Sequence, residues 1–276
     1  MKQYLEALKY CYKNGIDVQS RAGKVRKSFG FQMHFDLSIG FPAITTKKLA
    51  WKSVVSELLW FIEGSNDERR LAEILYDDKR ENLQNKKTIW SQNANSDYWK
   101  SKSKFEGDVG KIYGVQWRNF NGEDQLANLI HGLKNDPDSR RHIISSWNPP
   151  ELNDMSLPPC HVFSQFFVSQ KKLSCQLYQR SCDMFLGVPF NIASYSLFTH
   201  MLARECNLEV GFFIHSLGDF HIYEEHFDQV KMQLDRMPKD LPTLSFKTKN
   251  FFNYGINDFK LLDYEYHPKI EATMNV

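Results

Sequence analysis

A cysteine near the middle of the chain has neighbours typical of a reactive thiol. Cys160 follows Leu157-Pro158-Pro159 and precedes His161. Proline fixes its own φ and restricts the residue before it, so the two prolines hold the backbone rigid just ahead of the sulfur. A free thiol, with a pKa of about 8.5, needs nearby positive charge to become a thiolate nucleophile. Arg180 could supply that charge, and Cys160 is therefore a candidate nucleophile.

The other cysteines are predicted to be structural, because free cysteines are among the most buried residue types. They are Cys11, Cys175, Cys182 and Cys206. Cys182 lies between Ser181 and Asp183, so it could line the site without taking part in chemistry. The absence of a C-x-x-C pair favours neither a disulfide framework nor a zinc site, and we expect no metal.

A carboxylate within an apolar helix is the second candidate for chemistry. Residues 49–63 are predicted to form a nearly all-apolar helix, with Gly64 as its stop. Glu57 lies among the valines and leucines of this segment. Charged side chains are rarely buried unless they are paired or functional. Glu57 is therefore a candidate acid or base, the alternative being a paired structural ion.

The elements that position these groups follow from hydrophobic periodicity. Helices are predicted at 4–12, with Gly15 as a C-terminal cap, and at 190–206. Strands are predicted at 29–35, 142–147, 162–168 and 173–178, and further strands follow the two prolines of 232–243. Residues 77–107 are predicted to be a polar, solvated insertion tethered by Ile89-Trp90.

Length suits one large domain or two small ones, and because no segment reads as a linker we expect a single domain spanning residues 1–276. The chain has 276 residues, 42% of them hydrophobic, which is enough for a sizeable core. The formal charge of +2 gives no strong field that would favour DNA or a membrane surface. The N-terminal segment lacks the apolar core of a signal peptide, and no run of about 18 apolar residues occurs. We expect a soluble, cytoplasmic protein that binds neither DNA nor membranes.

Seven blocks of the sequence together resemble the thymidylate synthase family. They are FPAITTKKLAWKSVVSELLWFIEGS, IYGVQWRNF, DSRRHIISSWNP, LPPCH, SCQLYQRSCDMFLGVPFNIASY, LGDFHIYEEH and YHPKI. They cover nearly the whole chain in family order. The resemblance implies an α+β, mixed α/β fold whose large twisted mixed sheet, covered by helices, forms the interface of a homodimer with shared active sites.

The resemblance also implies the reaction, which moves a one-carbon unit from 5,10-methylenetetrahydrofolate to C5 of dUMP. A uracil C5 is a poor nucleophile, and a thiolate added at C6 turns it into an enolate that can attack. Cys160 matches that thiolate. Glu57 matches the acid/base position, and the family's catalytic network further implies Tyr113, His161 and Asp183.

The nucleotide and folate residues are implied in the same way. For dUMP they are Arg21, Gln179, Arg180, Ser181, Asn191, His221 and Tyr223, with Arg140 and Arg141 reaching across from the other subunit. For the folate they are Lys47, Ile89, Trp90, Asp183, Leu186, Gly187, Phe190, Asn275 and Val276. Guanidinium forks suit a phosphate dianion. An amide at position 191 can donate to uracil O4 and accept from N3–H, whereas a carboxylate would favour cytosine.

Several departures from the family pattern cluster around the folate. Ser91 stands where the family usually has Asp, Lys111 where it has Pro, and Asn275 where it has Ala; the loop after Arg21 also differs. A looser folate pocket would admit water to the exocyclic methylene intermediate. The alternative is therefore a dUMP hydroxymethylase of the kind found in phages with modified DNA, acting in the host cytoplasm. A catalytically silent nucleotide- or RNA-binding homologue is a remote third possibility, because the catalytic set is intact.

Overall fold

The computed structural model describes residues 1–20 and 23–273. Within them a six-stranded mixed sheet has the order β1-β2-β6-β5-β4-β3, with β5 and β6 parallel and the other pairs antiparallel. The strands are β1 (Ile16–Ser20), β2 (Gly23–Asp36), β3 (Ile143–Ser145), β4 (His161–Ser169), β5 (Lys172–Asp183) and β6 (Glu209–Tyr223). This architecture confirms the predicted α+β fold with a large mixed sheet.

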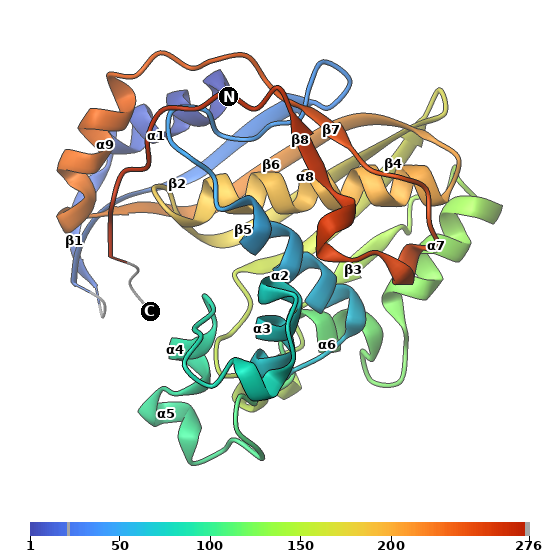
Figure 1. Cartoon of the computed structure of the whole chain (residues 1–276). Coiled ribbons are helices and arrows are strands. Elements are labelled where there is room, and N and C mark those ends of the chain that lie inside the picture. The colour runs from blue at the N-terminus through green and yellow to red at the C-terminus, as the bar shows by residue number, and fades with distance from the viewer. Residues whose placement is uncertain (21–22, 274–276) are drawn as a thin grey trace.

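Helices cover one face of this sheet. The long helix α8 (Gly187–Glu205) connects β5 to β6 and packs on both strands (Figure 1). The helix α2 (Trp51–Glu63) packs against α8, and α1 (Lys2–Asn14) packs on β2 and β6; their apolar faces complete the core. The helix α8 is apolar on nearly all sides, as expected for a helix buried between a sheet and other helices.

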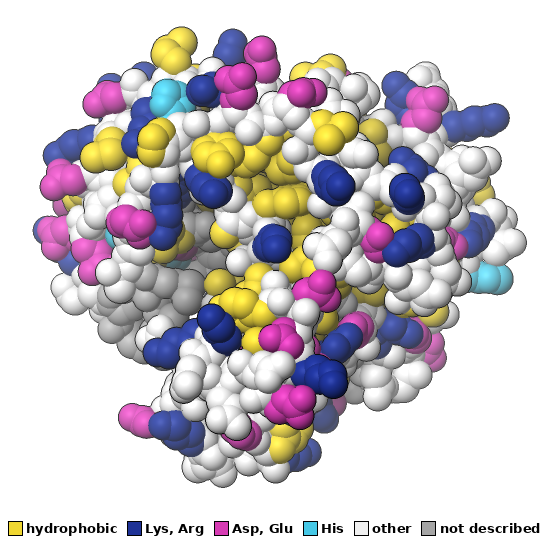
Figure 2. Space-filling model, viewed as in Figure 1, with side chains coloured by type: hydrophobic (Ala, Val, Ile, Leu, Met, Phe, Trp, Pro, Cys, Tyr) yellow, Lys and Arg dark blue, Asp and Glu magenta, His cyan; other side chains and the backbone are white. Residues whose placement is uncertain are grey.

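The remaining elements are short and lie around this core (Figure 1). They are α3 (Glu68–Tyr76), α4 (Ser91–Ala94), α5 (Asp97–Lys100), α6 (Tyr113–Arg118), α7 (Gln125–Asn135), α9 (Phe227–Leu234), β7 (Thr243–Ser245) and β8 (Lys260–Leu262), with several 3₁₀ turns. No helix in the described ranges is long and apolar enough to cross a membrane. On the face drawn in Figure 2, hydrophobic side chains gather in the middle, while basic and acidic side chains are interspersed around them.

The insertion at 77–107 is more firmly anchored than its composition predicted. Besides Trp90, the side chains of Leu83 and Trp99 are buried. The indole Nε1 of Trp99 donates a hydrogen bond to the carbonyl of Asp108 at 2.6 Å. The polar residues are thus a solvated exterior around three apolar anchors.

Two helices end at a glycine, and a different constraint favours glycine at each position. Gly64 has φ 74°, the left-handed conformation expected of a C-terminal cap. Gly15 also follows its helix directly, but its φ of −69° is ordinary. A Cβ on Gly15 would lie 2.5 Å from the carbonyl oxygen of Cys11, so close packing explains this glycine.

Candidate active site

Cys160 lies immediately before β4 and is held through its backbone. Its N–H donates to Oη of Tyr113 at 2.8 Å, and its carbonyl accepts from the backbone N–H of Arg180 at 2.9 Å. Tyr113 is the first residue of α6, and Arg180 belongs to β5. Hydrogen bonds from two other segments, α6 and β5, therefore fix the backbone of this cysteine.

The side chain of Arg180 is also tied to the prolines before Cys160. Its Nε donates to the carbonyl of Pro159 at 2.8 Å, and its Nη2 donates to the carbonyl of Pro158 at 2.7 Å. Burial raises the pKa of the Cys160 thiol, while the charge of Arg180 and hydrogen bonds with Tyr113 and Ser181 oppose the rise. The expectation that Arg180 favours the thiolate is thus correct in direction, but burial outweighs it.

Glu57 is buried on α2, as the sequence predicted, with 5% of its surface exposed. Its Oε1 accepts a hydrogen bond from Nε1 of Trp90 at 2.7 Å. Burial raises the pKa of Glu57 to about 7, although the Trp90 hydrogen bond lowers it. A carboxyl group with this pKa can both give and take a proton near neutrality.

The ring of His161 lies between two tyrosine rings. The centroid of Tyr113 is 5.1 Å away and that of Tyr195 is 5.3 Å away. Burial lowers the pKa of His161 to about 4, against a hydrogen bond with Asn191. This histidine is therefore neutral at pH 7, and it can take part in a hydrogen-bonded network but carries no charge.

A chain of buried polar side chains leads from Asn191 into the sheet. Asn191, on α8, accepts at Oδ1 from Nε2 of Gln179 at 3.1 Å. Gln179 Nε2 also donates to the carbonyl of Ser181 at 2.9 Å. Gln179 Oε1 lies 2.8 Å from Nε2 of His215 on β6. His215 was not among the residues predicted; the alternation of residues 211–217 would have located its strand but not its role.

Asp183 ends β5 and caps the turn into α8. Its Oδ1 accepts from the backbone N–H groups of Phe185 and Leu186 at 2.9 and 3.3 Å. Lys47 lies nearby. Its Nζ donates to the carbonyl of Phe185 at 2.5 Å and lies 3.5 Å from the centre of the Phe185 ring. Burial lowers the pKa of Lys47 to about 7, opposed by the charge of Asp183. Lys47 is therefore turned into the protein.

The other predicted residues occupy the ends of the same elements. His221 and Tyr223 lie on β6 with ring centroids 5.3 Å apart, and Nδ1 of His221 is 3.2 Å from a carboxylate oxygen of Asp219. Ile89, Leu186, Gly187 and Phe190 are partly exposed beside the core. Arg140 and Arg141 are exposed between α7 and β3, on a different segment. Arg21, Asn275 and Val276 lie outside the described residues.

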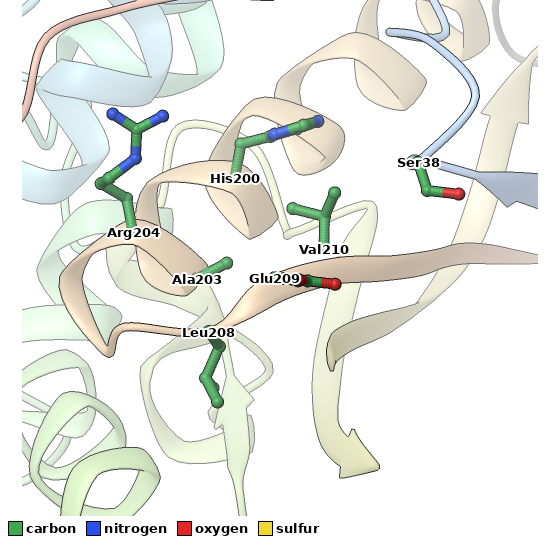
Figure 3. Close-up of a pocket in the computed structure, with 7 residues that line it drawn as sticks. All are labelled: Ser38, His200, Ala203, Arg204, Leu208, Glu209 and Val210. Atoms are coloured by element: carbon green, nitrogen blue, oxygen red, sulfur yellow. The ribbon is translucent and has the colours of Figure 1, made fainter. Parts of the chain in front are cut away.

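One cavity in the structure lies apart from all of these residues. It has a volume of about 330 Å³ and opens where α8 ends and β6 begins. Figure 3 shows His200 and Arg204 on the helix, Val210 and Glu209 on the strand, and Ser38 opposite them. None of the predicted catalytic or ligand-binding residues lines it. Among the residues of known placement, no group of three His, Cys, Asp or Glu side chains could hold a metal ion.

A positioned thiol, a buried carboxyl group with a pKa near 7 and a buried amide are the kinds of group that covalent and acid/base catalysis use. The thymidylate synthase family model matches residues 2–276. The thymidylate synthase of Mycoplasma pneumoniae is 45% identical over an alignment 298 positions long, which covers 100% of both chains. The chain belongs to the thymidylate synthase family.

Proposed function

We propose that this protein is a thymidylate synthase that transfers a one-carbon unit to C5 of dUMP and releases dTMP. Membership of the family over the full length of the chain supports this reaction. The single observation that carries the proposal is that the same protein has a Cys160 fixed through its backbone and a buried Glu57 whose pKa is about 7. The family uses 5,10-methylenetetrahydrofolate, which supplies both the carbon unit and the hydride.

Cys160 is proposed as the nucleophile that adds to C6 of the uracil ring. The bond to C6 makes C5 an enolate carbon, and the thiolate leaves again when the product forms. Because burial keeps the thiol protonated, its activation is expected on nucleotide binding. Arg180 is proposed to stabilise both the thiolate and a phosphate. It would do so either while keeping its hydrogen bonds to the carbonyls of Pro158 and Pro159 or after releasing them.

Glu57 is proposed as the group that moves protons to and from the base. After the carbon unit has been attached, the C5 proton must be removed, and a carboxylate with a pKa near 7 is suited to this step. Trp90 fixes the orientation of the carboxyl group. Tyr113 and His161 hold the surrounding network in place, and both are neutral at pH 7.

The nucleotide and folate sites are proposed on either side of these groups. Asn191 is proposed to read the uracil edge, with His221 and Tyr223 at the sugar. Residues of the turn from Asp183 to Phe190 and the ring of Trp90 are proposed to contact the folate. The second oxygen of Asp183, Oδ2, is the one we assign to the N–H edge of the pterin, because Oδ1 is engaged by the backbone.

A homodimer is proposed on the face of the sheet opposite to α8. Exposed aromatic side chains lie on three strands of the sheet, with Phe29 at 79%, Phe167 at 62% and Phe212 at 45% of their surfaces. Large exposed aromatic side chains on several strands of one sheet are typical of an interaction surface, and polar side chains such as Gln32, Gln176 and Ser216 lie between them. Arg140 and Arg141, exposed at the end of the sheet where β3 begins, are proposed to complete the partner's phosphate site.

The hydroxymethylase alternative rested on Ser91, Lys111, Asn275 and the loop after Arg21. Asn275 lies outside the described residues, whereas Ser91 and Lys111 both have structural partners. Ser91 Oγ donates to Glu68 Oε1 at 2.6 Å and accepts from the N–H of Thr88 at 2.8 Å. Lys111 pairs with Glu151 at 2.6 Å. These contacts tie both side chains into the scaffold, so their polarity does not by itself indicate a wet folate pocket. We therefore favour the synthase.

The proposal is tested by incubating the protein with dUMP and 5,10-methylenetetrahydrofolate. Mass spectrometry identifies the nucleotide product, and the near-ultraviolet rise of dihydrofolate reports hydride transfer. We expect dTMP and dihydrofolate in equal amounts. A hydroxymethyl nucleotide formed without dihydrofolate would establish the alternative instead, and no turnover at all would contradict the assignment as an enzyme.

A further inference from the structure

An asparagine can read either of two pyrimidines, depending on the direction in which its amide points. Uracil presents the N3–H donor beside the O4 acceptor, whereas cytosine presents the N3 acceptor beside an amino donor. The oxygen and nitrogen of an amide differ little in shape, so turning Asn191 by half a rotation would exchange one match for the other. The choice of base therefore depends on what holds the Asn191 amide.

Gln179 is the first group that holds it. The nitrogen of Gln179 donates to Oδ1 of Asn191 and to the carbonyl of Ser181. A backbone carbonyl can only accept, so the nitrogen of Gln179 must face Ser181. Since both of its hydrogens are then used, Asn191 must present its oxygen to Gln179. The Asn191 nitrogen is left to donate to the ligand, which is the orientation that suits uracil O4.

His215 is the second group in this arrangement. It is fully buried on β6, and its Nε2 is 2.8 Å from Oε1 of Gln179. Its other nitrogen, Nδ1, is buried without a hydrogen-bond partner in the described parts of the chain. A neutral imidazole has one N–H proton. Because the amide oxygen of Gln179 can only accept, that proton is assigned to Nε2 of His215. Burial lowers the pKa of His215 to about 3, which agrees with a neutral ring.

We propose that His215 is a positioning residue for base choice: its Nε2–H holds the amide of Gln179, which in turn holds Asn191 in the orientation that accepts uracil and rejects cytosine. The inference rests on the proposed function, because it requires Asn191 to face the base of a nucleotide. His161 also touches Asn191 but does not touch Gln179 Oε1, so His215 contributes separately.

Binding of dUMP and dCMP, measured by calorimetry without folate, tests the inference. Removing the donor in His215→Phe leaves the buried Gln179 oxygen unpaired, which weakens the arrangement that fixes Asn191. We expect the ratio of the dCMP to the dUMP dissociation constant to fall about tenfold. His215→Gln restores a side-chain N–H donor and should recover most of the ratio. A general loss of packing would not be rescued in this way.

His200→Phe is the matched control. His200 is also a largely buried histidine whose pKa burial lowers to about 4, and its Nε2 has no hydrogen-bond partner among the described residues. It lines the cavity of Figure 3 and is not part of the chain from Asn191 to His215. We expect this variant to keep the wild-type ratio whatever its stability.

The outcomes separate this inference from the proposed function. Wild-type protein that binds neither nucleotide would contradict both. Wild-type protein that prefers dUMP, together with a His215→Phe variant that keeps the same ratio, would overturn the inference alone. If His215→Phe does not fold, nitrogen-15 spectra of histidine-labelled wild-type protein decide. The proton of His215 is expected on Nε2, and a proton on Nδ1 instead would overturn the inference.

Discussion

The chemistry of single residues in this protein is set by burial acting against a few directed contacts. Burial raises the pKa of both Cys160 and Glu57, so both groups favour their protonated forms in the free protein. Specific contacts oppose each shift: Arg180, Tyr113 and Ser181 for the pKa of the thiol, and Trp90 for the pKa of the carboxyl group. A bound ligand that adds charge or excludes water can therefore change the pKa of either group without any movement of the backbone.

Replacing Cys160 by alanine is expected to abolish product formation, because addition to C6 has no substitute in this site. Turnover should fall below about a thousandth of wild type. Calorimetry should still detect dUMP, since the proposed nucleotide contacts remain. Cys206→Ala is the matched control, because Cys206 follows α8 and lies in no proposed site; it should keep wild-type turnover. Substantial activity in Cys160→Ala would refute the assignment of the nucleophile.

Replacing Glu57 by glutamine is expected to reduce turnover strongly and to change the pH dependence of stability. The pKa of Glu57 rises from 4.5 to about 7 on folding. Its protonated form is favoured in the fold, so its contribution to stability is complete below pH 4.5 and is lost as the pH rises through 7. The variant has no carboxyl group to ionise, so it avoids this loss. The free energy of unfolding of the variant minus that of wild type should therefore be up to about 3 kcal/mol larger at about pH 8 than at about pH 4.

Urea unfolding at several pH values checks this prediction. The amide introduced by Glu57→Gln can keep an oxygen that accepts from Trp90, so packing and hydrogen bonding should change little. A difference between the two proteins that is the same at acidic and at alkaline pH would show that Glu57 does not have a raised pKa. That result would also remove the main argument for its role as a base.

At the scale of elements, the insertion at 77–107 acts on the site through one side chain. Trp90 precedes α4 and donates its indole N–H to Glu57, whereas Trp99, on α5, donates to the carbonyl of Asp108. Both tryptophans are buried, at 5% and 2% exposure. The two indoles thus each donate a hydrogen bond to an oxygen, and that of Trp90 reaches Glu57, the carboxyl group that we propose to be catalytic.

Trp90→Phe is expected to move the pH profile of turnover. Loss of the indole donor removes a hydrogen bond to the carboxylate, so the pKa of Glu57 should rise above 7 by roughly one unit. The acidic limb of kcat at saturating substrate should shift to higher pH by the same amount. Trp99→Phe loses an indole hydrogen bond in the same insertion and should leave the limb in place. Equal profiles for both variants would contradict the role given to Trp90.

The sequence located several of the main elements because their patterns are local. The apolar helix that carries Glu57, the strand at 162–168 and the glycine stop at 64 all agree with the structure within a few residues. It missed β6, a central strand, and it ended β5 before the polar run at 179–183. These polar residues are paired across the sheet rather than solvated, and such pairing depends on contacts between distant segments. The same reason hid His215, whose partner is 36 residues away.

At the scale of the whole molecule, two features remain unexplained by a single chain. One face of the sheet carries exposed aromatic side chains, including Phe163, which stacks on Tyr178 at 6.1 Å. Arg140 and Arg141 are exposed, and the carbonyl of Arg140 is held by Gln165 on β4 at 3.3 Å. The arginine pair is therefore fixed to the end of the same sheet that presents the aromatic face. A partner bound to that face would cover the aromatic side chains and would lie next to Arg140 and Arg141.

Mixing two inactive variants tests whether sites are shared across a dimer. The Arg140→Glu variant keeps its own nucleophile but loses the phosphate contact that it would provide to its partner's site. The Cys160→Ala variant loses the nucleophile but keeps that phosphate contact. In a hybrid dimer, one site combines the intact Cys160 of one subunit with the intact Arg140 of its partner. Random exchange makes half of the dimers hybrids with one whole site, so activity should recover to about a quarter of wild type. Sedimentation must show dimers, and native mass spectrometry must show that exchange has occurred. Exchanged dimers that stay inactive, although each variant alone is folded and dimeric, would mean that every site is built from one subunit.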